Sequence, residues 1–595
     1  MVSLADIADN ANLTRAVRFV GHDKDDEVIR DPLSDVPFLD DLGFRLPDIS
    51  RRLIARTYEP RRVKVVEVGK SNYTTRPVSF IEMEDWVVAQ GILNLVAEDI
   101  DRKISPNSLA FRINPKRNES NRQKFFKSWY REWPKFVRRI RQSVSQTHPC
   151  LVVTDIAGYF EQIDLRILSD MLLTAEVPRE VIDLIFTQLE KWTWRDGFVA
   201  SKTRGLLQGN DVASVYANYY LSDVDEEMSG GTLIFQRFMD DINIHVASKS
   251  DGKRALSNLG IALRKKGLTL NSSKTKILEG AEIDRHFSWD VSDALEANLN
   301  DLRQLGDVVA VRHERQRLRR VILNLAVPNP HLLKRLITAY TWARDRRFVK
   351  EAVALLEANP DLTPKLTSYF RSLPTDRPLL SVVDFLDDPA RNVFPAQEQA
   401  LIENLLLASI SRAPTQQRLA ALARSKSGDL SVDPYSRALY VLLAYRCGEI
   451  VDLERLVDRY LANQEHDILP RKHLALCVTR LNDPARLQTV VDRLVQEADP
   501  SLREIGLFIH EIRHAQPNKV RTVIKRTALS LDTYYHPSTT RIARFKLRDL
   551  LLLNICRMNT QAGVRASLRQ RLTAWRAKLA CRVSDELIAE FIHRL

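Results

Sequence analysis

The segment at residues 233–246, LIFQRFMDDINIHV, constrains this chain more than any other. Apolar and polar residues alternate up to Phe238 and again from Ile242 onward, on both sides of a very short break. Such alternation predicts a β-hairpin. Two carboxylates, Asp240 and Asp241, lie at its tip without a glycine or asparagine to ease the turn. Adjacent carboxylates repel unless a divalent cation lies between them and a partner acid, so the tip is either a metal site or an ordinary acidic surface turn.

The composition favours several soluble domains and a polyanionic partner. A chain of 595 residues is too long for one core, and 44% hydrophobic with 28% charged residues is typical of soluble proteins. The formal net charge of +13 favours a polyanion without saying which one. Five scattered cysteines without CxxC spacing are expected to be reduced thiols. Neither a signal-peptide pattern nor a membrane-spanning run occurs, so we expect a cytoplasmic protein.

Residues 51–77 are strongly basic and contain a second predicted hairpin. The segment VKVVEVGK, residues 63–70, alternates and then turns at Gly69, which predicts a short strand pair. Lys70 and Arg76 would lie on this pair, where cations suit the binding of a triphosphate. A solvated edge strand protected by its charges would show the same pattern.

A second basic segment, residues 112–141, follows a helix predicted at residues 84–95. Its cations are interleaved with aromatic residues, and only Glu119 and Glu132 oppose them. Cations bind phosphates and aromatic rings stack on bases, so this composition is typical of a nucleic-acid groove. An amphipathic helix with buried rings would look similar, and the excess of positive charge favours the groove. Nucleic-acid contacts are expected from Arg112, Lys116 and Arg117, the first as a structural or template contact.

A third carboxylate follows a buried type of strand. Residues 151–153, LVV, are apolar and lead to Asp155. An acid at the end of an apolar strand is a common way to present a metal ligand from a rigid element. With Asp240 and Asp241 it gives three carboxylates, the number that a two-metal phosphoryl-transfer site needs. Such metals activate an attacking hydroxyl and steady the leaving pyrophosphate.

Four segments follow one another downstream of SLAFR (108–112): Asp155 with Phe160, LQGNDVAS at 207–214 with Ala217-Asn218 and Tyr220-Leu221, FMDD at 238–241, and GLTLN at 267–271 with Lys274-Thr275. In this order they resemble motifs A, B, C and D of a bacterial reverse transcriptase, and residues 51–290 resemble its fingers and palm. Four matches at family-like spacing make a coincidence of core residues an unlikely explanation.

The resemblance implies a two-metal centre. Asp155 and Asp240 would ligate two Mg²⁺ ions, and Asp241 would support the site. Lys274 would neutralise or protonate the pyrophosphate.

The resemblance also implies how a dNTP is bound. Phe160 falls at the steric-gate position, where a ring crowds a 2′-hydroxyl and favours deoxynucleotides. Gln208 and Gly209 would shape the nucleotide pocket, and Lys70 and Arg76 would match triphosphate-binding cations of the fingers.

Three departures from the family pattern concern primer and template. Phe238 replaces the usual tyrosine and so lacks a hydroxyl that can bond the primer strand. Leu207 replaces a usual proline, and Asn210-Asp211 stands where proline is common. The metal chemistry is left intact, whereas ordinary primer and template handling is in doubt.

After Trp289 helical periodicity replaces strand alternation. The apolar spacing of residues 453–461 recurs 34 residues later at 487–495 and begins again at 520. Paired helices at such intervals predict an α-solenoid resembling HEAT or TPR arrays, with a plain helical bundle as the alternative. The Asp-Pro pairs at 388, 433, 483 and 499 fit an Asp cap followed by proline in the first turn.

The predicted fold class is α+β. It comprises an N-terminal segment (residues 1–50), right-hand polymerase fingers and palm (51–290) and an all-α helical-repeat C-terminal domain (291–595).

A reverse-transcriptase palm joined to helical repeats resembles the abortive-infection and related defence-associated reverse transcriptases of bacteria. The resemblance implies anti-phage defence and a homo-oligomer. In some members DNA is made without a template and the first nucleotide is attached to a tyrosine of the protein. The candidates are Tyr58, Tyr73, Tyr534 and Tyr535. Conventional synthesis on a non-coding or cellular RNA competes with this route, and the changes in motifs B and C favour the untemplated one.

Two further hypotheses remain. An inert palm with a partner-binding solenoid is disfavoured, since clustered carboxylates are costly to keep without a use. A cyclase or primase palm also carries acid pairs, but Gln208-Gly209 and Lys274 favour a reverse transcriptase.

Overall fold

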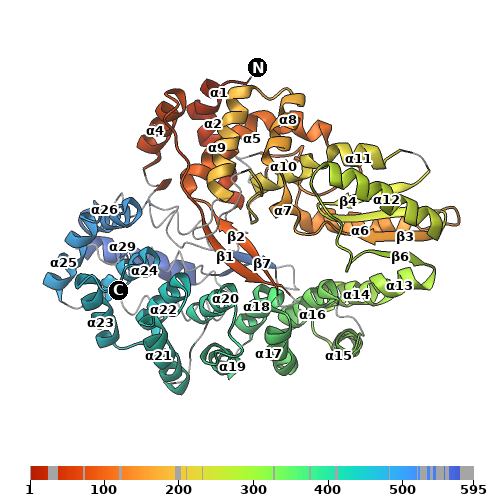
Figure 1. Cartoon of the computed structure of the whole chain (residues 1–595). Coiled ribbons are helices and arrows are strands. Elements are labelled where there is room, and N and C mark those ends of the chain that lie inside the picture. Colours follow the sequence, from red (N-terminus) through yellow and green to blue (C-terminus); the bar gives the residue numbers. More distant parts are fainter. Residues whose placement is uncertain are drawn as a thin grey trace. The chain divides into compact units, whose positions relative to one another are not determined.

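The computed structural model describes most of the chain in two units (Figure 1). Residues 2–516 are described except 24–37, 40, 71–73, 119–123, 194–202, 210, 231, 326–328, 374–376, 409, 411–412 and 482. Beyond them the described residues are 518, 520, 522, 532–535, 541–544, 555–556 and 562–576. Unit 1 comprises residues 1–30, 41–66 and 77–289, and unit 2 comprises residues 31–40, 67–76 and 290–595.

The centre of unit 1 is a four-stranded antiparallel sheet in the order β4-β5-β3-β6. Its strands are β3 (Cys150–Thr154), β4 (Ile234–Phe238), β5 (Asp241–Val246) and β6 (Lys276–Glu279). The hairpin predicted at residues 233–246 is confirmed as β4 and β5, and the predicted apolar strand is confirmed as β3. β3 is central and buried, which suits its run of β-branched and apolar residues.

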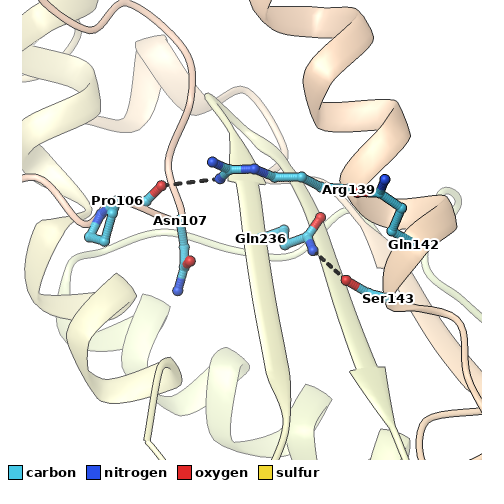
Figure 2. A pocket seen from close by; sticks show the side chains of 6 residues that line it. All are labelled: Pro106, Asn107, Arg139, Gln142, Ser143 and Gln236. Carbon is cyan, nitrogen blue, oxygen red and sulfur yellow. Dashed lines mark hydrogen bonds between the residues drawn. The ribbon is translucent and has the colours of Figure 1, made fainter.

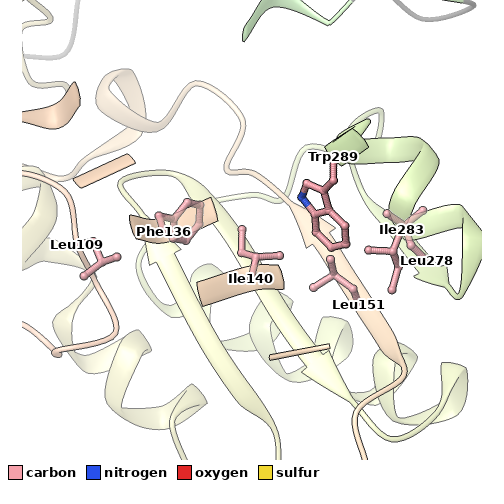
Figure 3. Packing of buried hydrophobic residues seen from close by; sticks show 7 residues of the cluster. All are labelled: Leu109, Phe136, Ile140, Leu151, Leu278, Ile283 and Trp289. Carbon is pink, nitrogen blue, oxygen red and sulfur yellow. The ribbon is translucent and has the colours of Figure 1, made fainter. Parts of the chain in front are cut away.

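The two faces of this sheet are covered by different helices. On one face α12 (Lys249–Lys265) approaches closely, since a Cβ on Gly252 would lie 3.2 Å from Val152. On the other face Phe136 and Ile140 of α6 (Trp129–Ser143) pack with Leu151 of β3 and Trp289 (Figure 3). Side chains alternate along a strand, so β3 supplies both cores.

Unit 1 contains further helices, of which α1, α2 and α4 lie within residues 4–54. These further helices are α1 (Leu4–Ala8), α2 (Asn10–Asp23), α4 (Leu42–Ile54), α5 (Met83–Lys103), α7 (Tyr159–Gln162), α8 (Leu165–Thr174), α9 (Arg179–Thr193), α10 (Asp211–Tyr220), α11 (Ser222–Met228) and α13 (Ala281–Phe287). The helix predicted at residues 84–95 is confirmed as the N-terminal part of α5, which extends further and is largely buried. α5 contacts both α1 and α2, and Asn12 Nδ2 donates to Gly91 O over 3.1 Å.

A two-stranded hairpin has residues assigned to both units. β1 (Lys64–Gly69) pairs with β2 (Thr75–Phe80), which confirms the strand pair predicted from residues 63–70.

Unit 2 is largely helical. Its helices are α14 (Trp289–Leu305), α15 (Val309–Leu323), α16 (Pro330–Ala343), α17 (Val349–Ala358), α18 (Thr363–Ser372), α19 (Arg377–Asp387), α20 (Pro395–Leu406), α21 (Ala413–Ser427), α22 (Pro434–Cys447), α23 (Ile450–Leu461), α24 (Ile468–Cys477), α25 (Pro484–Val495), α26 (Pro500–His514) and α29 (Ala562–Arg576). A short pair, β7 (Asp532–Tyr535) and β8 (Arg541–Arg544), was not predicted. No described helix is long and apolar enough to cross a membrane.

Neighbouring helices of unit 2 follow a regular order. Each even-numbered helix from α16 to α26 contacts the next even-numbered one, and α17, α19 and α21 contact each other in sequence. Three predicted Asp-Pro caps are confirmed: the side chains of Asp433, Asp483 and Asp499 accept from backbone N–H groups of the first turn. The prediction at Asp388 is wrong, because its carboxylate accepts from Ala390 N over 2.9 Å in a turn after α19.

Candidate active site

The three predicted carboxylates lie at one end of the palm sheet. Asp155 directly follows β3, and Asp241 begins β5. The two strands are paired with Thr154 opposite Ile242, so their ends bring Asp155 and Asp241 together. Asp240 occupies the turn between β4 and β5. Asp155 is 4% exposed, whereas the other two carboxylates are partly exposed.

Burial and mutual repulsion raise the pKa values of Asp240 and Asp241. Burial raises the pKa of Asp240, and the charge of Asp155 raises it further. Burial and the charge of Asp240 raise the pKa of Asp241 to about 7. Each ionised carboxylate therefore disfavours ionisation of the next, and a cation is the partner that would relieve this repulsion.

Lys274 is held against this end of the sheet. Its ammonium group contacts Asp155 Oδ2. Burial acts to lower the pKa of Lys274, but the hydrogen bond to Asp155 and that charge outweigh burial and raise it. The backbone is fixed too, because Asn271 N donates to Asp155 O over 2.8 Å and Thr275 Oγ1 lies 2.7 Å from Thr154 Oγ1.

The three carboxylates are suitable ligands for Mg²⁺, although their oxygens do not converge on one position. Within the described residues, no three His, Cys, Asp or Glu side chains converge closely enough to hold a metal ion. Asp155 Oδ2 contacts Lys274, while Asp155 Oδ1 is buried and has no hydrogen-bond partner among the described residues. An orphaned carboxylate oxygen beside two further carboxylates suits a hard cation. Lys274 would have to leave Asp155 for all three acids to converge on an ion.

Phe160, Gln208 and Gly209, three of the predicted nucleotide residues, lie on connected segments of unit 1. Phe160 of α7 is partly buried, and its carbonyl accepts from Leu206 N over 2.7 Å. Ser79 N donates to Gln208 O over 3.0 Å, so residues 206–209 run beside β2. Gly209 has φ +100°, and a Cβ there would lie 2.6 Å from a methyl carbon of Val78. Only glycine fits this approach, which gives a structural reason for the Gln208-Gly209 pair.

Lys70 and Arg76 are exposed and belong to unit 2, whereas the carboxylates belong to unit 1. Lys70 N donates to Thr74 O over 2.7 Å and helps to close the β1–β2 hairpin. Their predicted role in binding a triphosphate therefore stays a prediction.

Two of the residues predicted to contact nucleic acid form ion pairs inside the protein, which for Arg112 is the structural role that the sequence left open. Arg112 Nε pairs with Asp101 Oδ1 over 2.7 Å, and its Nη1 donates to backbone carbonyls. Arg117 pairs with Glu98 and lies over the ring of Phe125, 5.6 Å from the centroid. Both side chains are only 15% exposed, so their charges are used inside the protein.

Lys116 of the same segment is exposed, and its predicted role stays a prediction.

The exposed cations of the second basic segment lie on α6 instead. Phe136 and Ile140 are buried, as the amphipathic alternative requires, while Arg131, Arg138 and Arg139 are exposed. These three arginines form no ion pair within the described part of the chain. These arginines are seven residues and one residue apart, which the sequence shows. Only the structure shows which face of α6 is buried, and this distinguishes them from Arg112 and Arg117.

A polar pocket lies at the C-terminal end of α6 (Figure 2). It has a volume of about 370 Å³ and is lined by Pro106, Asn107, Arg139, Gln142, Ser143 and Gln236. Gln236 Nε2 donates to Ser143 Oγ over 2.9 Å. The pocket was not predicted, because it joins segments more than ninety residues apart.

The chain was compared with known protein families and solved structures. Residues 68–304 match the family described as reverse transcriptase (RNA-dependent DNA polymerase). Apo telomerase from Candida tropicalis, truncated from the C-terminal domain, is 13% identical with a TM-score of 0.26, covering 37% of this chain and 50% of that one. Telomerase from Candida albicans in complex with the TWJ fragment of telomeric RNA is 11% identical with a TM-score of 0.30, covering 59% and 63%. The chain thus spans about half to two thirds of these two proteins.

No curated protein matches the chain. The resemblance to reverse transcriptases is confirmed for the matched stretch. Residues 68–304 therefore match a reverse transcriptase domain, the domain of RNA-dependent DNA polymerases.

Proposed function

We propose that the chain is a Mg²⁺-dependent DNA polymerase that joins dNTPs at Asp155, Asp240 and Asp241 and acts in anti-phage defence, with protein-primed, untemplated synthesis. One observation carries the catalytic part. Three carboxylates lie at one end of the sheet, where Asp155 Oδ1 is buried and has no hydrogen-bond partner in the described part of the chain. An inert palm would have no reason to keep that arrangement, because a buried carboxylate oxygen without a partner is costly.

Each side chain of the centre has a distinct task in this proposal. Asp155, Asp240 and Asp241 would hold the ions, which when bound activate the attacking hydroxyl and neutralise the triphosphate. Lys274 already lies at Asp155, so on release from Oδ2 its ammonium can donate a proton to the leaving pyrophosphate. The partly buried ring of Phe160 would exclude a 2′-hydroxyl.

The exposed face of α6 supports a nucleic-acid path on unit 1. Arg131, Arg138 and Arg139 project cations that no described carboxylate neutralises. Phosphate groups of a strand are the natural partners for such a row, and neutralising them releases counterions. Lys116, also exposed, would extend this contact.

The surroundings of Phe238 support an unusual priming route. Its ring packs edge-on against Trp133, with 5.0 Å between the centroids, and lies 5.6 Å from Phe136. An apolar ring held in this cluster offers no hydroxyl to a primer strand. A protein hydroxyl as primer is consistent with that loss.

The structure reduces the number of tyrosines that could serve as the primer. Tyr58 is 7% exposed and its hydroxyl donates to Asp85 Oδ1 over 2.5 Å, so it is a poor primer and we withdraw it. Tyr73 lies outside the described residues. Tyr534 and Tyr535 belong to β7 and remain candidates.

Unit 2 supports the defence assignment through its architecture. Contacts between successive even-numbered helices from α16 to α26, and from α17 through α19 to α21, are what a stack of helix pairs produces. We propose that this region is a HEAT-like or TPR-like array and that the protein forms a homo-oligomer.

Incorporation of labelled dNTPs tests the whole proposal. Purified protein is incubated with Mg²⁺, with and without nuclease pretreatment, beside the Asp240→Ala variant. Label that stays with the denatured protein, resists nuclease pretreatment and disappears in the variant is the expected result. Tryptic mapping of the labelled peptide then identifies the tyrosine.

Two other results would change the proposal. Extension that requires an added primer and RNA template would support conventional reverse transcription and remove the protein-primed part. No incorporation by the wild type, under any of these conditions, would favour an inert palm.

A further inference from the structure

Arg237 is a fully buried cation one residue before the segment at 238–241. Its guanidinium pairs with Asp225 of α11 through two bonds, Nε to Oδ1 over 2.7 Å and Nη2 to Oδ2 over 2.5 Å. Nη2 also donates to Asn218 O over 3.2 Å, and Nη1 donates to Met239 O over 2.9 Å. Every nitrogen of the group has an acceptor, and one of these acceptors belongs to the turn that carries Asp240.

This turn has an unfavourable backbone. Met239 and Asp240 form a two-residue loop between Phe238 and Asp241. Met239 has φ +60°, in the left-handed region that residues other than glycine adopt at a cost. Hairpin loops with a positive φ at this position favour glycine. The conformation must therefore be held from outside, and the bond from Arg237 Nη1 to Met239 O is such a restraint.

The restraint is anchored on rigid neighbours. Arg237 N donates to Asn107 O over 3.0 Å, and Leu109 N donates to Arg237 O over 3.2 Å. Asn218, whose carbonyl accepts from Arg237, is itself fixed by a bond of 2.7 Å from Ser108 Oγ. Arg237 thus connects the SLAFR segment, α10 and the turn.

We infer that Arg237 is a positioning residue for Asp240. By holding the carbonyl of Met239, it fixes the peptide plane that joins Met239 to Asp240. That plane sets the direction in which the carboxylate of Asp240 leaves the turn, and so its place beside Asp155. Arg237 itself touches no substrate. The inference rests on the proposed function, because it takes Asp240 to be a carboxylate that the reaction uses.

Arg237→Lys separates the charge from the restraint. A lysine keeps a cation for Asp225, but its single ammonium cannot reproduce the planar fork that also reaches Met239 O. We expect kcat to fall about tenfold or more, with KM for the dNTP within about threefold. Mn²⁺ affinity, measured by electron paramagnetic resonance without substrate, should weaken about tenfold.

A second substitution provides the rescue. Glycine adopts φ +60° without the cost that methionine bears. If Arg237 acts through the turn, Met239→Gly in the Arg237→Lys protein should recover most of the lost Mn²⁺ affinity and part of kcat. A purely structural role for Arg237 predicts no such coupling between the two positions.

A matched double variant covers the case in which Arg237→Lys does not fold. Arg237→Gln with Asp225→Asn removes both buried charges together and also removes the bond to Met239 O. We expect the same tenfold loss of Mn²⁺ affinity. Unchanged Mn²⁺ affinity and kcat in a folded variant of either kind would overturn the inference. Absence of incorporation by the wild type would instead contradict the proposed function, so the two failures are distinguishable.

Discussion

Asp241 in unit 1 and Asp345 in unit 2 are two poorly exposed aspartates with opposite electrostatics. Burial and the charge of Asp240 raise the pKa of Asp241 to about 7. Burial also acts on Asp345, but hydrogen bonds from Arg347 and Arg315 outweigh it and lower that pKa to about 2. Asp345 accepts from Arg315 over 3.0 Å and from Arg347 over 2.7 Å.

The difference separates a structural carboxylate from one that is available for a reaction. Asp345 is paired with arginines of its own unit. Because one of them lies on α15, the ion pair connects α15 to the residues that follow α16. Among the described residues, only Asp155 of the three acids at the palm tip forms an ion pair, with Lys274. A carboxylate without a cationic partner in the folded protein can bind a ligand from outside the protein. Carboxylates with perturbed pKa values are for this reason common at functional sites.

The largest expected effect is the loss of activity at the palm tip. Asp240→Asn keeps the shape of the side chain and removes its charge, so incorporation should fall about 10³-fold or more, equivalent to about 4 kcal/mol of transition-state stabilisation. Asp345→Asn is the matched control, and activity per folded molecule should stay within about threefold. A single-turnover incorporation assay measures both. Equal losses in the two variants would remove the distinction between the acids.

The next effect concerns stability and has opposite signs at the two sites. Asp345→Asn weakens the pairs with Arg315 and Arg347, and we expect a loss of about 3 kcal/mol. Asp241→Asn relieves repulsion from Asp240, so the protein without metal should gain about 1–2 kcal/mol. Urea unfolding at pH 8 with EDTA gives the comparison, with separate probes for each unit. Destabilisation by Asp241→Asn would contradict it.

Asp85 of α5 tests whether the kind of partner decides the pKa. It is 1% exposed, and its bonds come from Tyr58 Oη and Arg61 N rather than from a cation. Burial raises its pKa to about 7, against about 3.9 in an unfolded chain. The folded state therefore holds a proton that the unfolded state releases between these values. This contribution to stability is present at low pH and is lost as pH rises through about 7.

Measured between pH 5 and pH 8, the effect of Asp85 should be about 2.5 kcal/mol, because the unfolded carboxyl is ionised throughout this range. Asp85→Asn should remove that part of the pH dependence, whereas Asp345→Asn should leave it in place. Urea midpoints at the two pH values give the answer. An unchanged slope in Asp85→Asn would show that its bonds from Tyr58 and Arg61 already suffice to stabilise the ionised form.

Local signals in the sequence account for much of the palm. Alternation around a short break predicts β4 and β5, and an apolar run predicts β3, because each strand is specified by neighbours in sequence. The meeting of Asp155 with Asp240 and Asp241 follows from motifs that resemble a known family. Gly209 is conspicuous in sequence, yet its need for φ +100° beside Val78 appears only in the fold.

Pairing between distant segments could not be predicted in the same way. Arg112 and Arg117 read as nucleic-acid contacts, because their partners Asp101 and Glu98 lie on α5 and composition does not reveal geometry. In the sequence, Arg237 is an ordinary polar residue of an alternating strand. Its role becomes apparent only in the structure, where it pairs with Asp225. The cap expected at Asp388 fails for a similar reason, since an Asp-Pro pair suits a turn as well as a helix start.

The smallest expected effect applies the same comparison to arginines. Arg138 on α6 is exposed and has no ion pair among the described residues, whereas Arg117 is committed to Glu98. Arg138→Gln should weaken binding of a single-stranded oligonucleotide about three- to tenfold and lower the salt dependence of the binding constant by about one unit, with no change in unfolding. Arg117→Gln should do the reverse, leaving the salt dependence unchanged and costing about 1 kcal/mol of stability. Fluorescence anisotropy over a range of KCl concentrations measures the slope. Arg117→Gln could instead lower the salt dependence as much as Arg138→Gln does. An internal ion pair would then not prevent a residue from contacting nucleic acid. The distinction between charges with and without an ion pair would in that case hold for the carboxylates alone.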